Sequence, residues 1–519
     1  MSSSEFKIKC RRIIVNRIFI TALFLILQIA WFALCIVKLS AFSGWISAAL
    51  MVLSLAIVLY IICKDDNPSY KIVWIILIML LPIFGGLLYL FAGNKKPSKH
   101  MHHRIQATKE KYLPMLKSFG EKGKSLEETD PRAYAVCRYI NNLSGYPVYS
   151  NTQVKYYPVG EMMFKDMLSE IRKAEHFIFL EYFIIGLGKM WDEMLEALVD
   201  RAEHGVEIRI IYDDMGCVAL LPPKYFKVLE KIHPNIKCLA FNPVVPVLSL
   251  VMNNRDHRKI LVIDGHTGFN GGINVSDEYI NETAPFGHWK DTGVMLRGDA
   301  VMNLTEMFLE LWHSFKDTEV KADIVKYAPE VYGEKYPSDG YVQPFYDTPL
   351  DTEPLSENVY IEILSRAEKY VYIYTPYLIL DDIMKNALCL AAKRGVDVRL
   401  VTPGIPDKKI IYRMTRANYT PLLKAGVRIF EYTPGFIHAK SFVSDDKIGV
   451  VGTINLDYRS LFLHFECGTL MYGNKAVSDL KKDCLDTFEK SREITRGNIR
   501  QYYRGTMFDA LLRLIAPLL

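Results

Sequence analysis

The sequence predicts an α/β protein with transmembrane helices at its N-terminus, followed by two duplicated halves, each an αβα sandwich, that form an internal pseudo-dimer. Three observations support this fold class. Long apolar runs are concentrated in residues 1–93. Beyond residue 130, a strand–helix–strand pattern occurs twice. The same short motif of histidine, lysine and aspartate follows each copy of that pattern.

Length and composition limit the number of domains and the classes of function. A chain of 519 residues exceeds the usual size of one domain, so we expect two or three folded units. Half of the residues are hydrophobic, whereas the net charge of +5 is too small to indicate nucleic-acid binding. The nine cysteines are dispersed without a Cys-x-x-Cys pair, which favours isolated thiols over a disulfide framework or a zinc site.

Three apolar runs are each long enough to cross a bilayer as a helix, which takes about 20 residues. The runs are Ile18–Val37, Trp45–Cys63 and Ile72–Ala92. A cleaved signal peptide is the alternative for the first run, but that run is too long and lacks a small-residue cleavage site. We therefore expect residues 1–93 to form a membrane anchor of two or three hydrophobic helices.

The basic residues around this anchor conflict with three crossings. One cluster precedes the first run and another follows the third, and the positive-inside rule would place both in the cytoplasm. Three crossings would put them on opposite sides. Pro82 and the Gly85–Gly86 pair weaken the third run, which is the best candidate for a re-entrant or interfacial helix. We expect a multi-pass membrane protein, and the side that holds the active site stays open.

Residues 94–130 are polar and rich in lysine, glutamate and serine, so we expect a juxtamembrane connector. His100, His102 and His103 lie in this stretch and suggest a metal site. An exposed basic segment close to anionic lipid headgroups is the favoured interpretation.

The rest of the chain repeats itself. The two halves are residues 131–335 and 336–519. In each half a helix ends at a glycine, Gly205 or Gly395, and a β-branched run follows as a buried strand. An apolar strand also precedes each helix, at Phe177–Ile184 and Tyr370–Thr375. Such βαβ units are typical of a largely parallel sheet flanked by helices.

Two copies of a His-x-Lys-(x)4-Asp motif carry the chemistry. The copies are His257, Lys259 and Asp264, followed by Gly271-Gly-Ile-Asn274, and His438, Lys440 and Asp445, followed by Gly452-Thr-Ile-Asn455. In a strand, residues i and i+2 face the same side, so the histidine and lysine of each copy project into one space. The aspartate falls at the end of the strand, where it can fix the following turn. Both asparagines are neutral donors suited to a phosphoryl oxygen.

Paired motifs of this kind suit phosphodiester transfer. One neutral imidazole attacks phosphorus, while a protonated imidazole on the far side gives its proton to the departing alkoxide. The lysines and asparagines bind the non-bridging oxygens as charge develops, so we expect no metal and no cofactor. A nucleophilic histidine also needs a partner for its other nitrogen. Asp291 and Glu466 are the candidates for this orienting role, with surface or structural carboxylates as the alternative.

These residues resemble the HKD motifs of the phospholipase D superfamily, and the wider pattern is similar to bacterial cardiolipin synthases. The similarity includes Asn254-Arg-Asp-His-Arg-Lys-Ile260, Asp277-Glu-Tyr279, His288-Trp289, Gly452-Thr-Ile-Asn-Leu-Asp-Tyr-Arg-Ser460 and the closing Leu511–Leu519. It implies two phospholipase D-like halves in a protein of the bacterial plasma membrane. The implied reaction is phosphatidyl transfer between two phosphatidylglycerol molecules, giving cardiolipin and glycerol. The resemblance also implies His257 as nucleophile, His438 as general acid and then base, and no metal.

Some positions depart from the family pattern. Lysine replaces the usual arginine at Lys290, threonine a frequent serine at Thr453, and histidine an asparagine at His464. Gln343–Asp347 lacks the usual Gly-Pro-Asp pattern. None of these departures removes an HKD residue, so they put headgroup or acceptor preference in question more than catalysis.

Several alternatives stay open. A membrane-anchored hydrolase of the phospholipase D type, or another phosphatidyltransferase, would form the same phosphohistidine. A nuclease is disfavoured because the globular part lacks a basic tract with interleaved aromatics. An inactive lipid-binding scaffold is disfavoured because all six HKD residues are present. The closing Leu511–Leu519 stretch suits docking on the catalytic core and contact with the bilayer equally, and the oligomeric state is not predicted.

Overall fold

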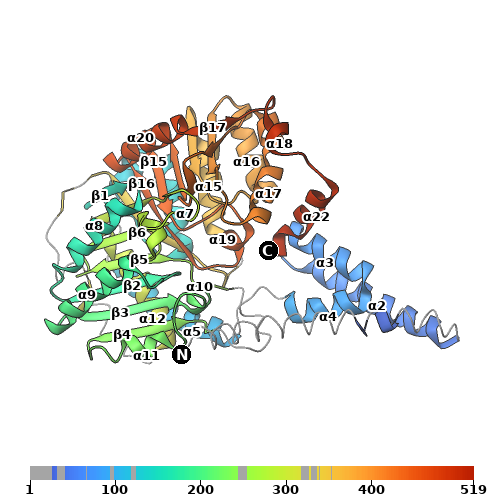
Figure 1. Ribbon diagram of the computed structural model, residues 1–519, viewed down its shortest axis with the longest axis horizontal. Helices are drawn as coiled ribbons and strands as arrows, with labels where there is room; N and C mark the ends of the chain where they lie inside the picture. The colour runs from blue at the N-terminus through green and yellow to red at the C-terminus, as the bar shows by residue number, and fades with distance from the viewer. Residues whose placement is uncertain are drawn as a thin grey trace.

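Two mixed β-sheets form the body of the protein (Figure 1). The computed structural model describes residues 26–27, 29–31, 41–65, 67–93, 99–118, 124–243, 254–316, 326–328, 336–337, 339–351 and 353–518. The first sheet consists of β1 (Thr152–Tyr157), β2 (Phe177–Tyr182), β3 (Glu207–Asp213), β4 (Ile236–Phe241), β5 (Lys259–Ile263), β6 (Thr267–Gly271) and β8 (Gly293–Gly298). The second consists of β9 (Tyr341–Asp347), β10 (Tyr370–Tyr374), β11 (Asp397–Pro403), β12 (Arg428–Tyr432), β14 (Ser441–Ser444), β15 (Ile448–Gly452), β16 (Glu466–Tyr472) and β17 (Ser491–Ile494).

The strand order is the same in both sheets. The first sheet runs β1-β8-β6-β5-β2-β3-β4, and the second runs β9-β16-β15-β14-β10-β11-β12 with β17 added at its edge. Strands β2, β3 and β4 are parallel, as are β10, β11 and β12, whereas all other neighbours pair antiparallel. The predicted duplication is therefore confirmed. The expected largely parallel sheet was wrong, because β5, β6 and β8 return through short antiparallel connections.

The two βαβ units are also confirmed. Helix α9 (Lys189–Glu203) connects β2 to β3, and α16 (Asp382–Lys393) connects β10 to β11. Gly205 and Gly395 follow these helices with φ angles of 92° and 96°. This left-handed conformation is free of strain only for glycine, and it turns the chain directly into the next strand.

Helices cover both faces of each sheet. On the outer face of the first sheet lie α8 (Gly160–Ile171) and α9. On the outer face of the second lie α7 (Pro131–Ser144), α15 (Leu355–Arg366), α16 and α18 (Tyr419–Ala425). Between the two sheets, one shared core includes residues of α12 (Val301–Phe315) and α20 (Lys475–Glu489). The two halves therefore share a continuous hydrophobic interior, as a pseudo-dimer requires.

Two segments pack differently from their expected domain. Helix α7, which begins at the expected start of the first half, contributes Val136, Cys137 and Ile140 to the core of the second half. The expected connector is not simply an exposed segment, because α5 (Lys99–Ser118) packs against α12 and buries Met101, Ile105 and Tyr112. Its polar face stays exposed at His102 and His103.

The N-terminal apolar residues form α2 (Ala41–Cys63), α3 (Pro68–Leu80) and α4 (Pro82–Ala92). The third apolar run is interrupted at Leu81, because Pro82 has no amide hydrogen to continue a helix. Helices α3 and α4 pack closely at Gly85, where a Cβ atom would lie 2.6 Å from the Leu77 carbonyl oxygen. Within the described ranges, no helix combines the length and the apolarity that a membrane crossing requires. Most of the first apolar run, Ile18–Val37, lies outside the described residues.

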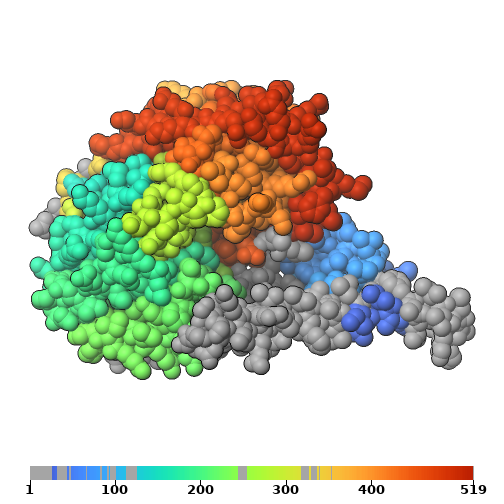
Figure 2. All heavy atoms as spheres, in the orientation of Figure 1, coloured from blue at the N-terminus to red at the C-terminus, as the bar shows by residue number. Residues whose placement is uncertain are grey.

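Short elements complete the chain. They are α6 (Lys124–Thr129), α10 (Asp214–Cys217), α11 (Tyr225–Leu229), η2 (Asp277–Ile280), β7 (His288–Lys290), β13 (Gly435–Ile437), α17 (Lys409–Ala417), α19 (Tyr458–Phe462), α21 (Ile499–Tyr502), α22 (Met507–Ile515) and η3 (Ala516–Leu518). Figure 2 shows the C-terminal residues, in red, on the same side of the molecule as the light-blue N-terminal helices.

Candidate active site

His257 lies just before β5, where the first half meets the second. Its backbone amide donates to the carbonyl oxygen of Phe465 at 2.9 Å. The strand itself begins at Lys259, so the histidine occupies an extended lead-in to β5 and not the strand proper. Backbone pairing with the other half therefore fixes where this imidazole lies.

The imidazole of His257 is held by Glu466 of the second half. Its Nδ1 lies 2.9 Å from both carboxylate oxygens. Ser460 and Thr453 also donate their hydroxyl hydrogens to Glu466. Three donors thus fix this buried carboxylate, and its hydrogen bond to Nδ1 leaves Nε2 of His257 available for chemistry.

The surroundings of His438 correspond to those of His257, with the two halves exchanged. Its amide donates to the Lys290 carbonyl oxygen at 2.7 Å, where β13 runs parallel to β7. Its Nδ1 lies 2.6 Å from the Asp291 carboxylate. The other oxygen of Asp291 accepts the Thr292 amide hydrogen at 2.9 Å. The structure thus brings both expected orienting carboxylates to the histidines, each to the histidine of the opposite half.

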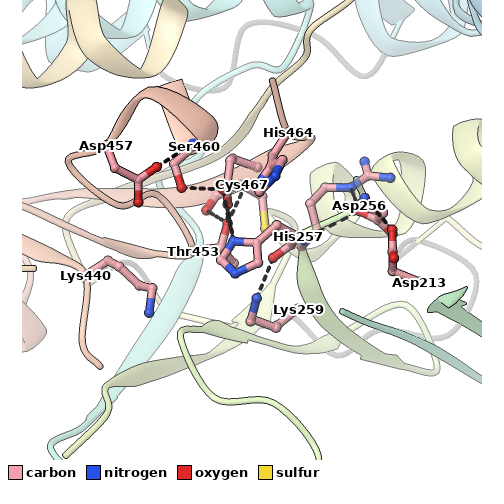
Figure 3. Close-up of polar contacts among 12 residues, drawn as sticks. Asp213, Asp256, His257, Lys259, Lys440, Thr453, Asp457, Ser460, His464 and Cys467 are labelled. Carbon is pink, nitrogen blue, oxygen red and sulfur yellow. Dashed lines mark hydrogen bonds and ion pairs between the residues drawn. The ribbon is translucent and has the colours of Figure 1, made fainter. Parts of the chain in front are cut away.

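The lysines of the two motifs are almost completely buried and face the same space. Lys259 donates to the His257 carbonyl oxygen at 2.6 Å, and Lys440 donates to the His438 carbonyl oxygen. Figure 3 shows the Lys440 side chain beside the group formed by His257 and Lys259. Burial lowers the pKa of Lys259 to about 8 and that of Lys440 to about 7, and the charge of Lys259 also lowers the latter. Two cations are thus concentrated where an anion would offset their repulsion.

Burial also governs the protonation of the histidines. It lowers the pKa of His257 to about 3 and that of His438 to about 4, although the carboxylates beside them act in the opposite direction. Burial alone would raise the pKa values of Glu466 and Asp291, but each histidine beside them holds its carboxyl group below the usual range. Without a bound anion, burial therefore favours a neutral imidazole hydrogen-bonded to a carboxylate in both pairs near neutral pH.

The two predicted phosphate-binding asparagines have different surroundings. Asn274 accepts the Ile184 amide hydrogen at 3.0 Å and donates to the Tyr279 hydroxyl at 2.7 Å, so its amide group is already engaged. Asn455 is also buried, but its Oδ1 has no hydrogen-bond partner among the described residues. The amide group of Asn455 is therefore not held at its oxygen as that of Asn274 is, and its Nδ2 is the donor that would meet a phosphoryl oxygen.

The motif aspartates lie away from the histidines. Asp264 accepts the amide hydrogens of Glu175, His176 and Phe177 at 2.8 Å. Asp445 accepts those of Glu368, Lys369 and Tyr370 at 2.7 to 2.9 Å. They sit at the far ends of β5 and β14, about 17 Å along a five-residue strand from the lysine end in the case of β5. Each fixes the entry to the neighbouring strand instead of the turn that follows it, which gives these two residues a structural role.

Sequence reasoning missed a buried network behind His257. Arg258 lies 2.7 Å from Glu181 and 3.1 Å from Asp256, and all three side chains are buried. The available signal was a single glutamate within the otherwise apolar β2. This network holds the lead-in to β5 rigid from the side opposite to the site.

His464 gives the site a third imidazole. Within the described part of the chain, His257, His464 and Glu466 offer possible ligand atoms that all lie within 4.8 Å of one another, a donor set that suits Zn²⁺. Glu466, however, already accepts three side-chain hydrogen bonds. A cation here would displace the hydrogens that position the carboxylate. The expectation that the reaction needs no metal stays a prediction.

Known families match most of the described body. The family described as "Cardiolipin synthase, PLD-like domain" matches residues 167–312 and 360–487, more than half of the chain. The phospholipase D-nuclease N-terminal family matches residues 49–94. A phosphatidylserine synthase of Haemophilus influenzae has the same fold, with a TM-score of 0.55 and 12% identity over 74% of this chain and 100% of its own.

Relatives in several bacteria match nearly the full length of the chain. A cardiolipin synthase of Halalkalibacterium halodurans is 31% identical, covering 92% of this chain and 96% of its own. Cardiolipin synthase 2 of Bacillus anthracis is 32% identical over 88% of each chain. An uncharacterized protein of Streptococcus mutans is 44% identical over 89% of this chain and 99% of its own. With two HKD motifs facing one buried space, the chain belongs to the cardiolipin synthase family of phospholipase D-like proteins.

Proposed function

We propose that this protein is a cardiolipin synthase, a phosphatidyltransferase that joins two phosphatidylglycerol molecules into cardiolipin and releases glycerol. One observation carries the proposal. Two buried histidines, each oriented by a carboxylate from the opposite half, lie beside two buried lysines. This arrangement suits a two-step displacement at phosphorus with one nucleophile and one proton carrier.

In the first step, Nε2 of neutral His257 attacks the phosphorus of one phosphatidylglycerol. The bond from phosphorus to the headgroup glycerol oxygen breaks, and His438 gives that oxygen a proton. The product is a phosphatidyl-histidine and free glycerol. We assign the nucleophile to His257, whose Nδ1 is held by Glu466 so that Nε2 is free, and the proton carrier to His438 beside Asp291. The negative charge of a bound phosphodiester further favours protonation of His438.

In the second step, His438 removes the proton from a headgroup hydroxyl of a second phosphatidylglycerol. That oxygen attacks phosphorus, the bond to His257 breaks, and cardiolipin forms. Water in place of the lipid hydroxyl would give phosphatidic acid, so exclusion of water decides between transfer and hydrolysis.

The charged oxygens of both transition states need donors. We assign this role to Lys259, Lys440 and Asn455, with Glu466 and Asp291 as the positioning residues of the two histidines. The buried lysines are pre-arranged around the reaction space, so little reorganisation accompanies the build-up of charge. The amide of Asn274 is held by Ile184 and Tyr279, and we assign it to the support of the loop after β6.

We further propose that the N-terminal segment, residues 1–93, attaches the enzyme to the cell membrane and that the two halves beyond residue 130 form the catalytic body. The apolar runs and the exposed apolar side chains of α2, including Trp45, Met51 and Val52, support this attachment. Extraction of membranes at alkaline pH tests it: an integral protein stays with the lipid pellet.

Incubation of the purified full-length protein with phosphatidylglycerol tests the reaction. Cardiolipin and glycerol in equal amounts are expected from the wild type, with none from a variant that lacks both histidines. Phosphatidic acid and glycerol would identify a hydrolase instead. No change in the lipid would identify a binding scaffold.

The same assay tests metal independence. Because the lysines supply the positive charge, we expect full activity in excess EDTA. Loss of activity in EDTA that a divalent ion restores would contradict this expectation and point to the group of His257, His464 and Glu466.

A further inference from the structure

The last helix of the chain, α22, is apolar on two faces. Its inner face packs Leu512, and Ala516 just beyond it, against Ile379, Met414 and Tyr458 of the second half. Its only acidic residue, Asp509, caps the helix through Thr506 and pairs with Arg413. The inner face thus anchors the helix firmly to the catalytic body.

The outer face of α22 exposes large apolar side chains. Met507 is 90% exposed, Phe508 52% and Leu511 53%. Positions i, i+1 and i+4 lie on one side of a helix, so these three side chains form a single apolar surface. Several large apolar side chains exposed side by side are typical of a surface that contacts a partner or a membrane. No described residue covers this outer face.

This surface continues onto the neighbouring helices. Helix α17 contacts α22 and exposes Ile410, and α3 contacts α22 and exposes Ile72. Figure 1 shows α22 beside α3, next to the C-terminus. The exposed face of the C-terminal helix is thus continuous with the N-terminal apolar helices, although the two segments stand at opposite ends of the sequence.

Basic side chains border the apolar surface. Arg504 and Arg513 are exposed on the α22 segment, and Lys409 is exposed on α17. The guanidinium of Arg413 lies 5.6 Å from the centre of the Phe508 ring. Next to them, a cleft of about 390 Å³ is lined by Ile72, Leu514 and Arg513, together with Lys385 and the Asp382 carboxylate that pairs with it. Apolar side chains bordered by cations are the pattern of a helix that lies in the surface of an anionic bilayer.

The inner face of α22 also reaches the active-site loop. Tyr458, which packs in the same cluster as Leu512, follows Asn455 by a few residues in the segment after β15. Asn67, which caps α3, donates to Asp381 at the start of α16 at 3.0 Å. The surface formed by α3 and α22 is therefore rigidly linked to the side of the second half that carries Asn455.

We propose that α22 lies in the surface of an anionic phospholipid bilayer, with Met507, Phe508 and Leu511 among the acyl chains and the bordering arginines at the phosphate level. This contact rests on the proposed membrane attachment and gives the second half a fixed orientation at the membrane. A lipid phosphate at Arg513 then lies at the cleft that Tyr458, in the segment after Asn455, also lines.

Depth-dependent quenching tests the contact without any turnover. The full-length protein, with its reactive thiols including the exposed Cys63 replaced by serine, carries one fluorophore at Leu511→Cys or, as a control, at Met162→Cys. Met162 is 50% exposed on α8 of the first half, away from the proposed surface. In vesicles that contain phosphatidylglycerol and acyl-chain quenchers, the label at position 511 is expected to lose most of its emission and the label at 162 little.

Equal quenching at both positions, or none at position 511, would overturn the proposal. So would disulfide formation between unlabelled Leu511→Cys chains in the vesicles under an added oxidant, together with an absence of quenching, since a second copy would then cover the surface. These outcomes do not depend on whether cardiolipin forms, so they are separate from failure of the proposed reaction.

Matched substitutions test the consequence for activity. Met507→Glu is expected to raise the KM for phosphatidylglycerol in vesicles by about tenfold, because a charge replaces an inserted apolar side chain. Met162→Glu is expected to leave that KM unchanged. Both methionines are at least half exposed, so neither change disturbs the core. An unchanged KM in Met507→Glu, or an equal rise in both variants, would contradict the contact.

Discussion

The two histidines differ in how firmly their carboxylates are held. Glu466 accepts from His257, Ser460 and Thr453, whereas Asp291 accepts from His438 and a backbone amide. A carboxylate loaded with donors is a weaker base, and the pKa of Glu466 lies well below its usual range. His257 is therefore fixed in one tautomer with Nε2 free, which suits a nucleophile. Asp291 accepts fewer side-chain hydrogen bonds than Glu466, so it is the better partner for an imidazolium at His438.

These unequal roles predict different responses to the leaving group. His257→Ala and His438→Ala are each expected to abolish turnover of phosphatidylglycerol. With a phosphatidyl ester of a nitrophenol, which leaves without a proton, His438→Ala is expected to give a burst of one nitrophenolate per chain and His257→Ala none. Rapid-mixing absorbance measures the burst. A burst in His257→Ala, or near-full activity in either variant with phosphatidylglycerol, would sink the assignment.

The lowered lysine pKa values predict the dependence of activity on pH. Lys259 and Lys440 must be protonated to bind the phosphodiester, and burial lowers their pKa values to about 8 and about 7. Their contribution is therefore present at lower pH and is lost as pH rises through these values. We expect kcat/KM to fall between about pH 7 and pH 8, well below the ordinary titration of lysine.

The variant Lys440→Arg tests whether the lysines cause this fall of kcat/KM with rising pH. Arginine stays charged throughout, so the fall at the lower of the two pKa values is expected to disappear even if the rate is reduced. If kcat/KM of the wild type stayed constant up to pH 9, the proposal that activity depends on protonated Lys259 and Lys440 would be wrong.

At the scale of single elements, α12 is the most deeply placed helix. It runs through the shared core, and nearly every side chain on it is buried. Glu306 lies on this helix with both carboxyl oxygens lacking a hydrogen-bond partner among the described residues. Burial and the neighbouring Glu310 raise its pKa well above the usual value, so the folded protein holds Glu306 protonated.

This burial predicts that Glu306→Gln stabilises the protein, and more so at higher pH. The unfolded state loses the Glu306 proton above its ordinary pKa while the folded state keeps it, so the wild type loses stability as pH rises. Glutamine has no such cost. Thermal unfolding at pH 5 and pH 8 measures the difference, with the exposed Glu196→Gln on α9 as control. If Glu306→Gln changed the Tm relative to the wild type by the same amount at pH 5 and pH 8, Glu306 would not be held protonated in the folded protein.

At the scale of the whole molecule, the site exists only where the halves meet. Strands β7 and β13 pair in parallel across the interface, and the Thr292 and Ser441 hydroxyls lie 2.9 Å apart. Lys290 of β7 reaches α20 of the second half and pairs with Asp483 at 2.7 Å, with both side chains largely buried. Because the Lys290 carbonyl also holds His438, this ion pair couples the assembly of the halves to the site.

Asp483→Ala therefore tests the interface. It leaves the Lys290 ammonium buried without its partner, and such a change costs about 3–5 kcal/mol. Asp479→Ala on the same helix removes only an exposed pair with Lys475, worth about 1 kcal/mol or less. Denaturant unfolding measures both, and activity is expected to fall only in Asp483→Ala. Equal effects of the two substitutions would show that the buried pair does not hold the halves together.

Local sequence patterns predict the duplication, the βαβ units and the six HKD residues, because periodicity, glycine positions and residue types are local properties. They also make Asp291 and Glu466 candidates for the orienting carboxylates. The fold pairs each carboxylate with the histidine of the opposite half, and His257 and Glu466 stand 209 positions apart. It also assigned Asp264 and Asp445 to strand entries and moved α7 to the core of the second half. Such pairings depend on which surfaces bury each other, and no local pattern in the chain encodes that choice.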